Sequence, residues 1–154
     1  MRRNLFVAAV LVAALAACAS SPKPAEETSR ERFKHTFDFM WGQTEAELAE
    51  EWKIESADKA TRTLVTSWNE QMHPMSHFGV RRRITVTLEG DEVEGFLVKA
   101  KEEAEKNTEE VTPMSKEDAD WDPTDTDGAR AKKFLMNLYI RLHPKETWKE
   151  NEIR

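Results

Sequence analysis

The sequence predicts an α+β fold: a small antiparallel β-sheet of three or four strands, packed by one N-terminal and one C-terminal amphipathic helix. Between residues 81 and 89, apolar and polar residues alternate, which is the pattern of a strand with one buried face. Between residues 131 and 142, apolar residues recur at helical spacing. The strand-like runs follow one another without a helix between them, so we expect a meander.

The first helix is expected to begin near Asp38, whose carboxylate can accept from the free N–H groups of the first turn, and to end by about Glu51. The residues also allow a second arrangement. Thr44 and Glu47 have the spacing of a capping box, so the chain could break at Gly42 and start a helix again at Thr44.

The expected strands are four short runs rich in β-branched or alternating residues, at 52–55, 61–68, 81–89 and 93–101. In the third run, the even-numbered residues from Arg82 to Leu88 should face one side of the sheet and the odd-numbered residues the other. Residues 69–80 contain Pro74 and Gly79 and are expected to form a long loop.

The C-terminal third starts with an acidic stretch, 102–127, that is poor in apolar residues and is expected to form a polar loop. Asp127 can then cap the last helix, which Pro144 ends. The chain therefore divides into a signal peptide (1–17), a flexible tether (18–30), one α+β domain that carries the polar loop (31–144), and a charged tail (145–154).

The N-terminus has the order of a secretory signal: Arg2 and Arg3, an apolar run, and small residues before a cleavage site. The sequence Leu15-Ala16-Ala17-Cys18 resembles the lipobox of bacterial lipoproteins. That resemblance implies cleavage before Cys18 and a lipid on its sulfur, which would anchor the protein in a membrane. Ala19 follows in place of the Asp that retains such proteins in the inner membrane, which favours the periplasmic face of the outer membrane in a Gram-negative cell. The alternative is an ordinary cleaved signal with a chance Cys.

A second resemblance covers about residues 36–101. It rests on hydrophobic positions and turns, notably Phe37-Asp38-Phe39-Met40-Trp41, Trp52-Lys53-Ile54-Glu55, Leu64-Val65-Thr66-Ser67-Trp68 and Arg81-Arg82-Arg83. The pattern is similar to the helix-plus-sheet domains of BamC-type accessory lipoproteins of the outer-membrane β-barrel assembly machine. The resemblance implies the fold class and a role in envelope assembly, and it implies no functional residue.

The composition disfavours several classes of function. The chain has 29 acidic and 23 basic residues and a formal charge of −6, which disfavours a general nucleic-acid binder because such proteins neutralise phosphates. Its one Cys is Cys18, which the lipobox would use for the lipid, so the folded part has no thiol for a disulfide or a thiolate metal site. No glycine-rich phosphate loop and no nucleophile–base pattern occurs, so we expect a protein that is not an enzyme and needs no cofactor.

Two segments could hold a metal. Met72, His73, Met75 and His77 offer thioether and imidazole ligands that suit Cu(I), with a plain loop as the alternative. Five aspartates between 118 and 127 invite a Ca²⁺ hypothesis. Their spacing fails the EF-hand pattern, and we expect a solvated loop there.

Two sets of side chains could make contacts. The sequence could place a basic stripe on the open sheet face, suited to lipid or lipopolysaccharide phosphates and formed by Arg62, Arg81, Arg82, Arg83, Lys99 and Lys101. The alternative, which is more common for such residues, is that they simply form the solvent-exposed face of an antiparallel sheet. Among the tryptophans, Trp41, Trp52 and Trp68 have core-like spacing, whereas Trp121 and Trp148 lie in polar segments and are the better candidates for exposed contacts.

Together these features predict a lipid-anchored envelope protein that is a non-enzymatic binding or accessory factor in envelope or outer-membrane assembly. Its partners would be the membrane, through the lipid on Cys18, and a protein of the envelope. The alternative function is copper or small-ligand binding by the loop from Met72 to His77.

Overall fold

A computed structural model describes residues 22–73, 78–112 and 114–144. Its elements in chain order are β1 (Ala25–Thr28), α1 (Phe37–Glu51), β2 (Ile54–Asp58), β3 (Thr63–Thr66), β4 (Asn69–His73), β5 (Phe78–Asp91), β6 (Gly95–Asn107), β7 (Trp121–Thr124) and α2 (Ala129–Leu142). All strands belong to one antiparallel sheet in the order β1-β6-β5-β3-β2, while β4 pairs with β5 and β7 pairs with β6. The α+β class is confirmed, and the sheet has seven strands instead of the three or four expected.

A long hairpin of β5 and β6 forms the centre of the sheet. It runs in unbroken register from Val80 opposite Lys106 to Asp91 opposite Gly95. At the turn, the Asp91 carboxylate accepts hydrogen bonds of 2.8 Å from the N–H groups of Val93 and Glu94. Gly90 has a φ of +109°, and a Cβ there would lie 2.3 Å from the Gly95 carbonyl oxygen. This turn joins the third and fourth expected strands directly, as the expected meander requires.

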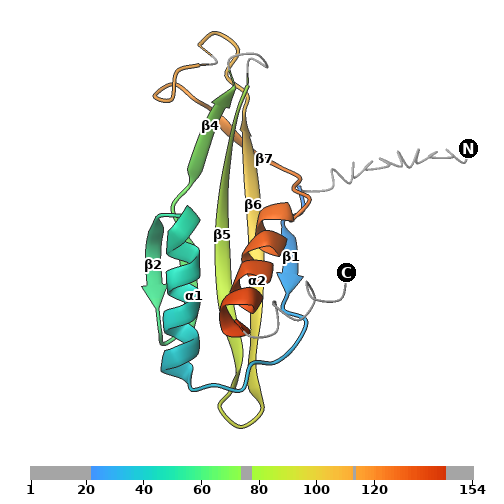
Figure 1. The fold of residues 1–154 in the computed structure, drawn as a ribbon. Coiled ribbons are helices and arrows are strands. Elements are labelled where there is room, and N and C mark those ends of the chain that lie inside the picture. The colour runs from blue at the N-terminus through green and yellow to red at the C-terminus, as the bar shows by residue number, and fades with distance from the viewer. Residues whose placement is uncertain (1–21, 74–77, 113, 145–154) are drawn as a thin grey trace, which may run out of the picture.

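Both helices lie on one face of the sheet and cover its lower part, leaving the upper part with β4 and β7 without a helix (Figure 1). The even-numbered residues of β5 and β6 face the helices and build the core, as the alternation predicted. The core is completed by side chains from α1 and α2, and its fully buried members include Met40, Leu48, Leu64, Ile84, Val86, Leu88, Phe96, Val98 and Leu138. This burial of apolar side chains is what stabilises the sheet against the two helices.

Helix α1 is continuous from Phe37 to Glu51, so the break at Gly42 does not occur. Its N-cap is Thr36, whose hydroxyl accepts from the N–H of Phe39 at 3.4 Å. The expected cap, Asp38, lies in the first turn instead and pairs with Lys59 at 2.9 Å. The N-cap prediction was wrong by two residues because Thr36 already has the extended backbone that a cap requires.

Helix α2 begins after Gly128, which has a left-handed backbone and no capping side chain. Glu102 of β6 takes over this role, since its carboxylate accepts from the N–H groups of Arg130 at 3.0 Å and Ala131 at 3.4 Å. Thr126 donates a further bond of 2.8 Å to the same carboxylate. The carboxylate of Asp127, the expected cap, accepts from the N–H of Ala129 at 3.0 Å, but the N-cap position itself is Gly128. A buried sheet carboxylate therefore fixes the start of this helix.

Three segments expected to be irregular contain strands. Within the expected tether, residues 25–28 form β1 and pair with residues 99–102 of β6. Within the expected polar loop, residues 102–107 continue β6 and 121–124 form β7. The expected loop at 69–80 contains β4 and the start of β5. In all three, cross-strand pairing with the central hairpin outweighs a local sequence that is weak in β-formers.

Candidate interaction surface

The face of the sheet opposite the helices, here called the open face, is built by the odd-numbered residues of β5 and β6. Register places them side by side in rows: Arg81 with Glu105, Arg83 with Glu103, Thr85 with Lys101, Thr87 with Lys99 and Glu89 with Leu97. In the described part of the chain, both helices lie against the other face, so these side chains are partly exposed.

The charged side chains of the open face form ion pairs with one another. Arg81 and Arg83 contact the carboxylates of Glu105 and Glu103, in each case at 2.6 Å. Partial burial pushes the pKa of Glu103 up, but the hydrogen bonds from Lys101 and Arg83 outweigh it and hold that pKa below its usual value. Lower on the face, Lys101 lies 2.9 Å from Glu103.

The expected basic stripe is therefore only partly correct. Arg81, Arg83, Lys99 and Lys101 do share the open face, but each lies within ion-pair distance of a carboxylate. Arg82 points to the helix side, 3.6 Å from Glu102. Arg62 donates to the carbonyl of Gly90 and lies over two aromatic rings near the turn. Paired cations are poor ligands for phosphate because their charge is already compensated.

Two tryptophans lie against the arginines at the upper end of this face. The guanidinium carbon of Arg81 is 4.7 Å from the ring centroid of Trp68 and 4.8 Å from that of Trp121. The guanidinium carbon of Arg83 is 4.6 Å from the Trp68 ring. These distances are those of cation–π contacts. We call these four side chains the Trp–Arg cluster.

Each part of the Trp–Arg cluster comes from a different element. Trp68 lies in the short connection between β3 and β4, the arginines come from β5, and Trp121 is the first residue of β7. Gly79 provides space beside them: a Cβ there would lie 2.5 Å from the Met72 sulfur and 3.1 Å from the Trp121 ring. Strand β5, the two ion pairs of its arginines and the Met72 side chain packed beside Trp121 therefore hold the cluster in place.

The tryptophan expectations are borne out in part. Trp41 and Trp52 are buried, with 3% and 7% of their surface exposed. Trp68 is partly exposed on the open face, so its expected burial was wrong. Trp121 is partly exposed as well, and Trp148 lies outside the described residues. The hairpin turn could have located the arginines of the cluster from the sequence. Extending both strands from that turn in regular register places Arg81 opposite Glu105 and Arg83 opposite Glu103.

A shallow hollow of about 170 Å³ continues the open face below the cluster. It is lined by Glu26, Thr85, Thr87, Glu89, Lys99 and Lys101. Lys99 lies 2.8 Å from Glu89 and 4.0 Å from Glu26. The pKa of Lys99 is raised chiefly by its hydrogen bond to Glu89. The hollow therefore offers hydroxyls and paired charges.

The candidate copper loop lies mostly outside the described residues. Met75 and His77 belong to the undescribed segment, and His73 pairs through its backbone with Phe78. The Met72 sulfur packs over Gly79 next to Trp121. Over the described ranges, no group of three or more His, Cys, Asp or Glu side chains is placed to hold a metal ion. Copper binding stays a prediction, and Met72 already has a packing role.

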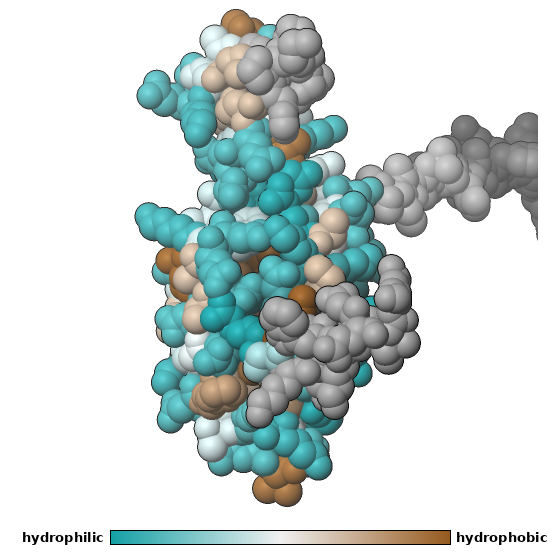
Figure 2. Space-filling view, in the orientation of Figure 1, coloured by the Kyte–Doolittle hydropathy of each residue, from teal (hydrophilic) through white to brown (hydrophobic). Residues whose placement is uncertain are grey.

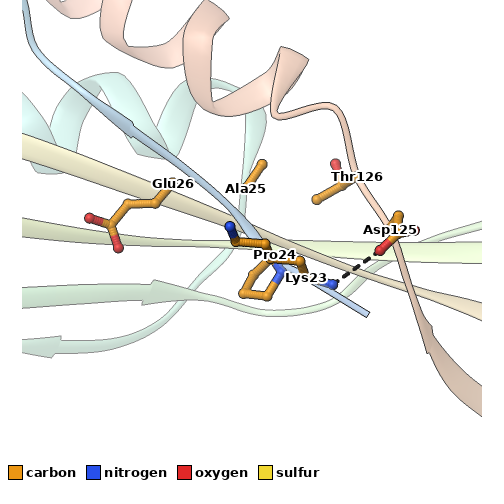
Figure 3. A pocket seen from close by; sticks show the side chains of 6 residues that line it. All are labelled: Lys23, Pro24, Ala25, Glu26, Asp125 and Thr126. Atoms are coloured by element: carbon orange, nitrogen blue, oxygen red, sulfur yellow. Dashed lines mark hydrogen bonds between the residues drawn. The ribbon is translucent and has the colours of Figure 1, made fainter. Parts of the chain in front are cut away.

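The chain reaches the sheet beside the β7–α2 connection. The N–H of Lys23 donates to the Asp125 carboxylate at 3.0 Å, and Ala25 and Thr126 lie on the side toward α2 (Figure 3). A hollow of about 500 Å³ lies between these two segments. Cys18 is outside the described residues, seven positions before β1. In the described part of the chain, neither helix has the length and apolar character to span a membrane.

The helix side of the molecule offers less for recognition. Figure 2 shows this side as mostly hydrophilic, with apolar residues scattered and not gathered in one patch. The large apolar side chains exposed in the described residues are Phe39, Val93, Val111, Met114, Met136 and Ile140. Single exposed apolar residues of this kind are normal on a protein surface.

No protein-family model matches this chain, and no curated protein matches it significantly.

Proposed function

We propose that this protein is a lipid-anchored component of the bacterial envelope that acts by binding, as a non-enzymatic accessory factor in envelope assembly. The observation that carries the proposal is the Trp–Arg cluster, which lies on the face of the sheet that no described helix covers. Trp and Arg are the residues most enriched among the energetic centres of binding surfaces. Here the arginines are held by ion pairs before any partner binds, which lowers the entropy cost of binding.

The position of β1 supports a membrane-proximal role. Ala25 comes seven positions after Cys18, and a fully extended chain of seven residue steps spans at most about 25 Å. Ala25 pairs directly with Glu102 in the sheet. A lipid on Cys18 would therefore hold the folded body close to the membrane surface.

The anchor is tested with Cys18→Ser in a bacterial host that processes lipoproteins. We expect the wild-type chain to incorporate labelled fatty acid, to lose the mass of residues 1–17 and to fractionate with membranes. The variant should keep its signal and carry no label, since the lipid needs the sulfur. Ser20→Ala is the matched control and should behave like the wild type. Membrane retention and mass that do not change in Cys18→Ser would refute the anchor.

Binding through the open face is tested by site-specific photo-crosslinking in cells. A photoreactive residue at Thr85, beside Arg83 on the open face, should give a discrete crosslinked species. The same residue at Ala46, exposed on α1, is the control and should give none. Equal crosslinking from both positions, or none from Thr85, would contradict a binding role for this face.

A further inference from the structure

We propose that the Trp–Arg cluster and the hollow below it bind the uncharged sugar backbone of a glycan chain, of the kind formed by the alternating amino sugars of peptidoglycan. The inference rests on the proposed envelope location and goes beyond it by naming the ligand class of the open face. Three properties of the open face support it: its balanced charges, its combination of aromatic and polar side chains, and its linear shape.

The charge balance argues against ligands with a high net charge. Arg81 and Arg83 are each paired with a carboxylate at 2.6 Å, and Lys99 is paired with Glu89 at 2.8 Å. Binding phosphate would require these pairs to open and would leave Glu103 and Glu105, which are only partly exposed, without their partners. A polymer of neutral sugars leaves all these pairs intact.

The mixture of groups matches a sugar ring. A pyranose has apolar C–H faces and a rim of hydroxyl and amide groups. The indoles of Trp68 and Trp121 provide flat apolar contact area. The ion-paired side chains around them provide fixed donors and acceptors, and Thr85 and Thr87 add hydroxyls that can serve as either. An apolar peptide would instead cover these charged groups without giving them hydrogen bonds, which is costly.

The shape of the surface suits a linear ligand. The cluster and the hollow follow one another along β5, from Arg81 to Thr87, a length of about 20 Å at the usual rise per strand residue. The strand and its cross-strand ion pairs keep the contact groups in a fixed row. Several consecutive sugar units can therefore lie along this row.

The test is co-sedimentation with purified peptidoglycan sacculi, using the chain from residue 18 to 154 with Cys18→Ser so that no lipid is present. Vesicles with anionic lipids are run in parallel. We expect the protein to sediment with sacculi and to stay bound in 0.5 M salt, because the binding does not depend on unpaired charge. Failure to sediment with sacculi, loss of sacculus binding in salt, or equal binding to the vesicles would overturn the proposal.

Variants locate the binding site. Trp68→Ala with Trp121→Ala should weaken sacculus binding at least tenfold, whereas Phe39→Ala, the loss of an exposed aromatic side chain on α1, should leave it unchanged. Thr87→Glu leaves the cluster intact, puts a larger, charged side chain into the hollow opposite Lys99 and should also weaken binding, so the test does not depend on a variant that unfolds. Circular dichroism checks the folding of each protein. Wild-type binding by the double tryptophan variant or by Thr87→Glu would contradict the assignment.

The glycan proposal and the proposed function can fail separately. If the crosslinked species from Thr85 is a protein adduct that resists muramidase, and sacculi do not bind, the glycan inference is wrong while a binding role of the open face stands. If sacculi bind but Cys18→Ser changes neither mass nor fractionation, the glycan inference stands and the lipid anchor is wrong.

Discussion

The two faces of the β5–β6 hairpin have the same backbone and very different chemistry. On the helix side, Ile84, Val86 and Phe96 are buried in the core. On the open side, their neighbours are arginine, threonine and glutamate, joined by cross-strand ion pairs. Because side chains alternate along a strand, one stretch of sequence builds both surfaces.

The two faces therefore predict that stability and the proposed binding can be separated residue by residue. Burial of apolar area outweighs partly exposed ion pairs by several-fold per side chain. Substitutions on the helix side should therefore change the free energy of unfolding, and substitutions on the open side should chiefly change binding.

The largest expected difference lies between Phe96→Ala and Thr87→Ala. Phe96 is almost fully buried and lies 6.0 Å from the Phe37 ring, so its truncation leaves a cavity and should cost about 3–5 kcal/mol. Thr87 lies on the open face, and its truncation should cost no more than about 0.5 kcal/mol. Denaturant unfolding followed by circular dichroism measures both. Similar losses in the two variants would show that the open face also carries the core stability.

Two adjacent glutamates allow a closer comparison. Glu102 is 1% exposed and bonds the first turn of α2, so Glu102→Ala should cost about 2–3 kcal/mol, the range for hydrogen bonds to a charged group. Glu103, one residue later, points to the open face, and Glu103→Ala should cost less than about 1 kcal/mol. Thermal unfolding of the two variants at pH 7 provides the measurement. A larger loss for Glu103→Ala would reverse the assignment of the two faces.

Ion pairs on the helix side and on the open face should differ in how much they contribute to the free energy of unfolding. Arg141 contacts Glu47, a carboxylate of α1 that is 7% exposed, at 2.7 Å, and it also contacts Glu50. Arg141→Met leaves Glu47, which has little access to water, without this partner and should lower the free energy of unfolding. Arg83→Met on the open face should cost less, because Glu103 is more exposed and keeps Lys101. Equal free energies of unfolding for the two variants would show that burial does not decide the strength of these pairs.

Sequence reasoning recovered the parts of the fold that depend on periodicity. The alternation in β5, the apolar face of β6, the hairpin turn and the extent of α2 follow from local patterns. The extension of β6 was missed because residues 102–106 read Glu-Glu-Ala-Glu-Lys, an acidic run without the β-branched and aromatic residues typical of strands. Those residues are in the sheet because of distant partners: Glu102 bonds the start of α2, while Glu103 and Glu105 pair with arginines of β5.

The candidate surface was predicted only in part for the same reason. The sequence placed Arg81 and Arg83 on an open face, but their pairing depends on strand residues that looked like a loop. Trp68 has the spacing of a core residue, and its position depends on where β3 ends and β4 begins. β1 and β7 are four-residue strands with few β-formers, and only their pairing with β6 identifies them.

The smallest expected effect concerns the turn that joins the two faces at one end of the hairpin. Hydrogen bonds from the N–H groups of Glu94 and Val93, helped by the charges of Arg62 and Arg32, hold the pKa of Asp91 below its ordinary value. A carboxyl whose pKa is lowered by folding stabilises the folded state above its unfolded pKa, and this contribution is lost as the pH falls through the folded pKa. Asp91→Asn keeps an acceptor for both N–H groups and removes the titration. We therefore expect the variant to be slightly less stable at pH 7 and to lose less stability than the wild type below about pH 4, near the unperturbed pKa of Asp. Unfolding midpoints measured between pH 7 and pH 2.5 check this, and parallel curves for the two proteins would show that the Asp91 carboxylate does not stabilise the turn.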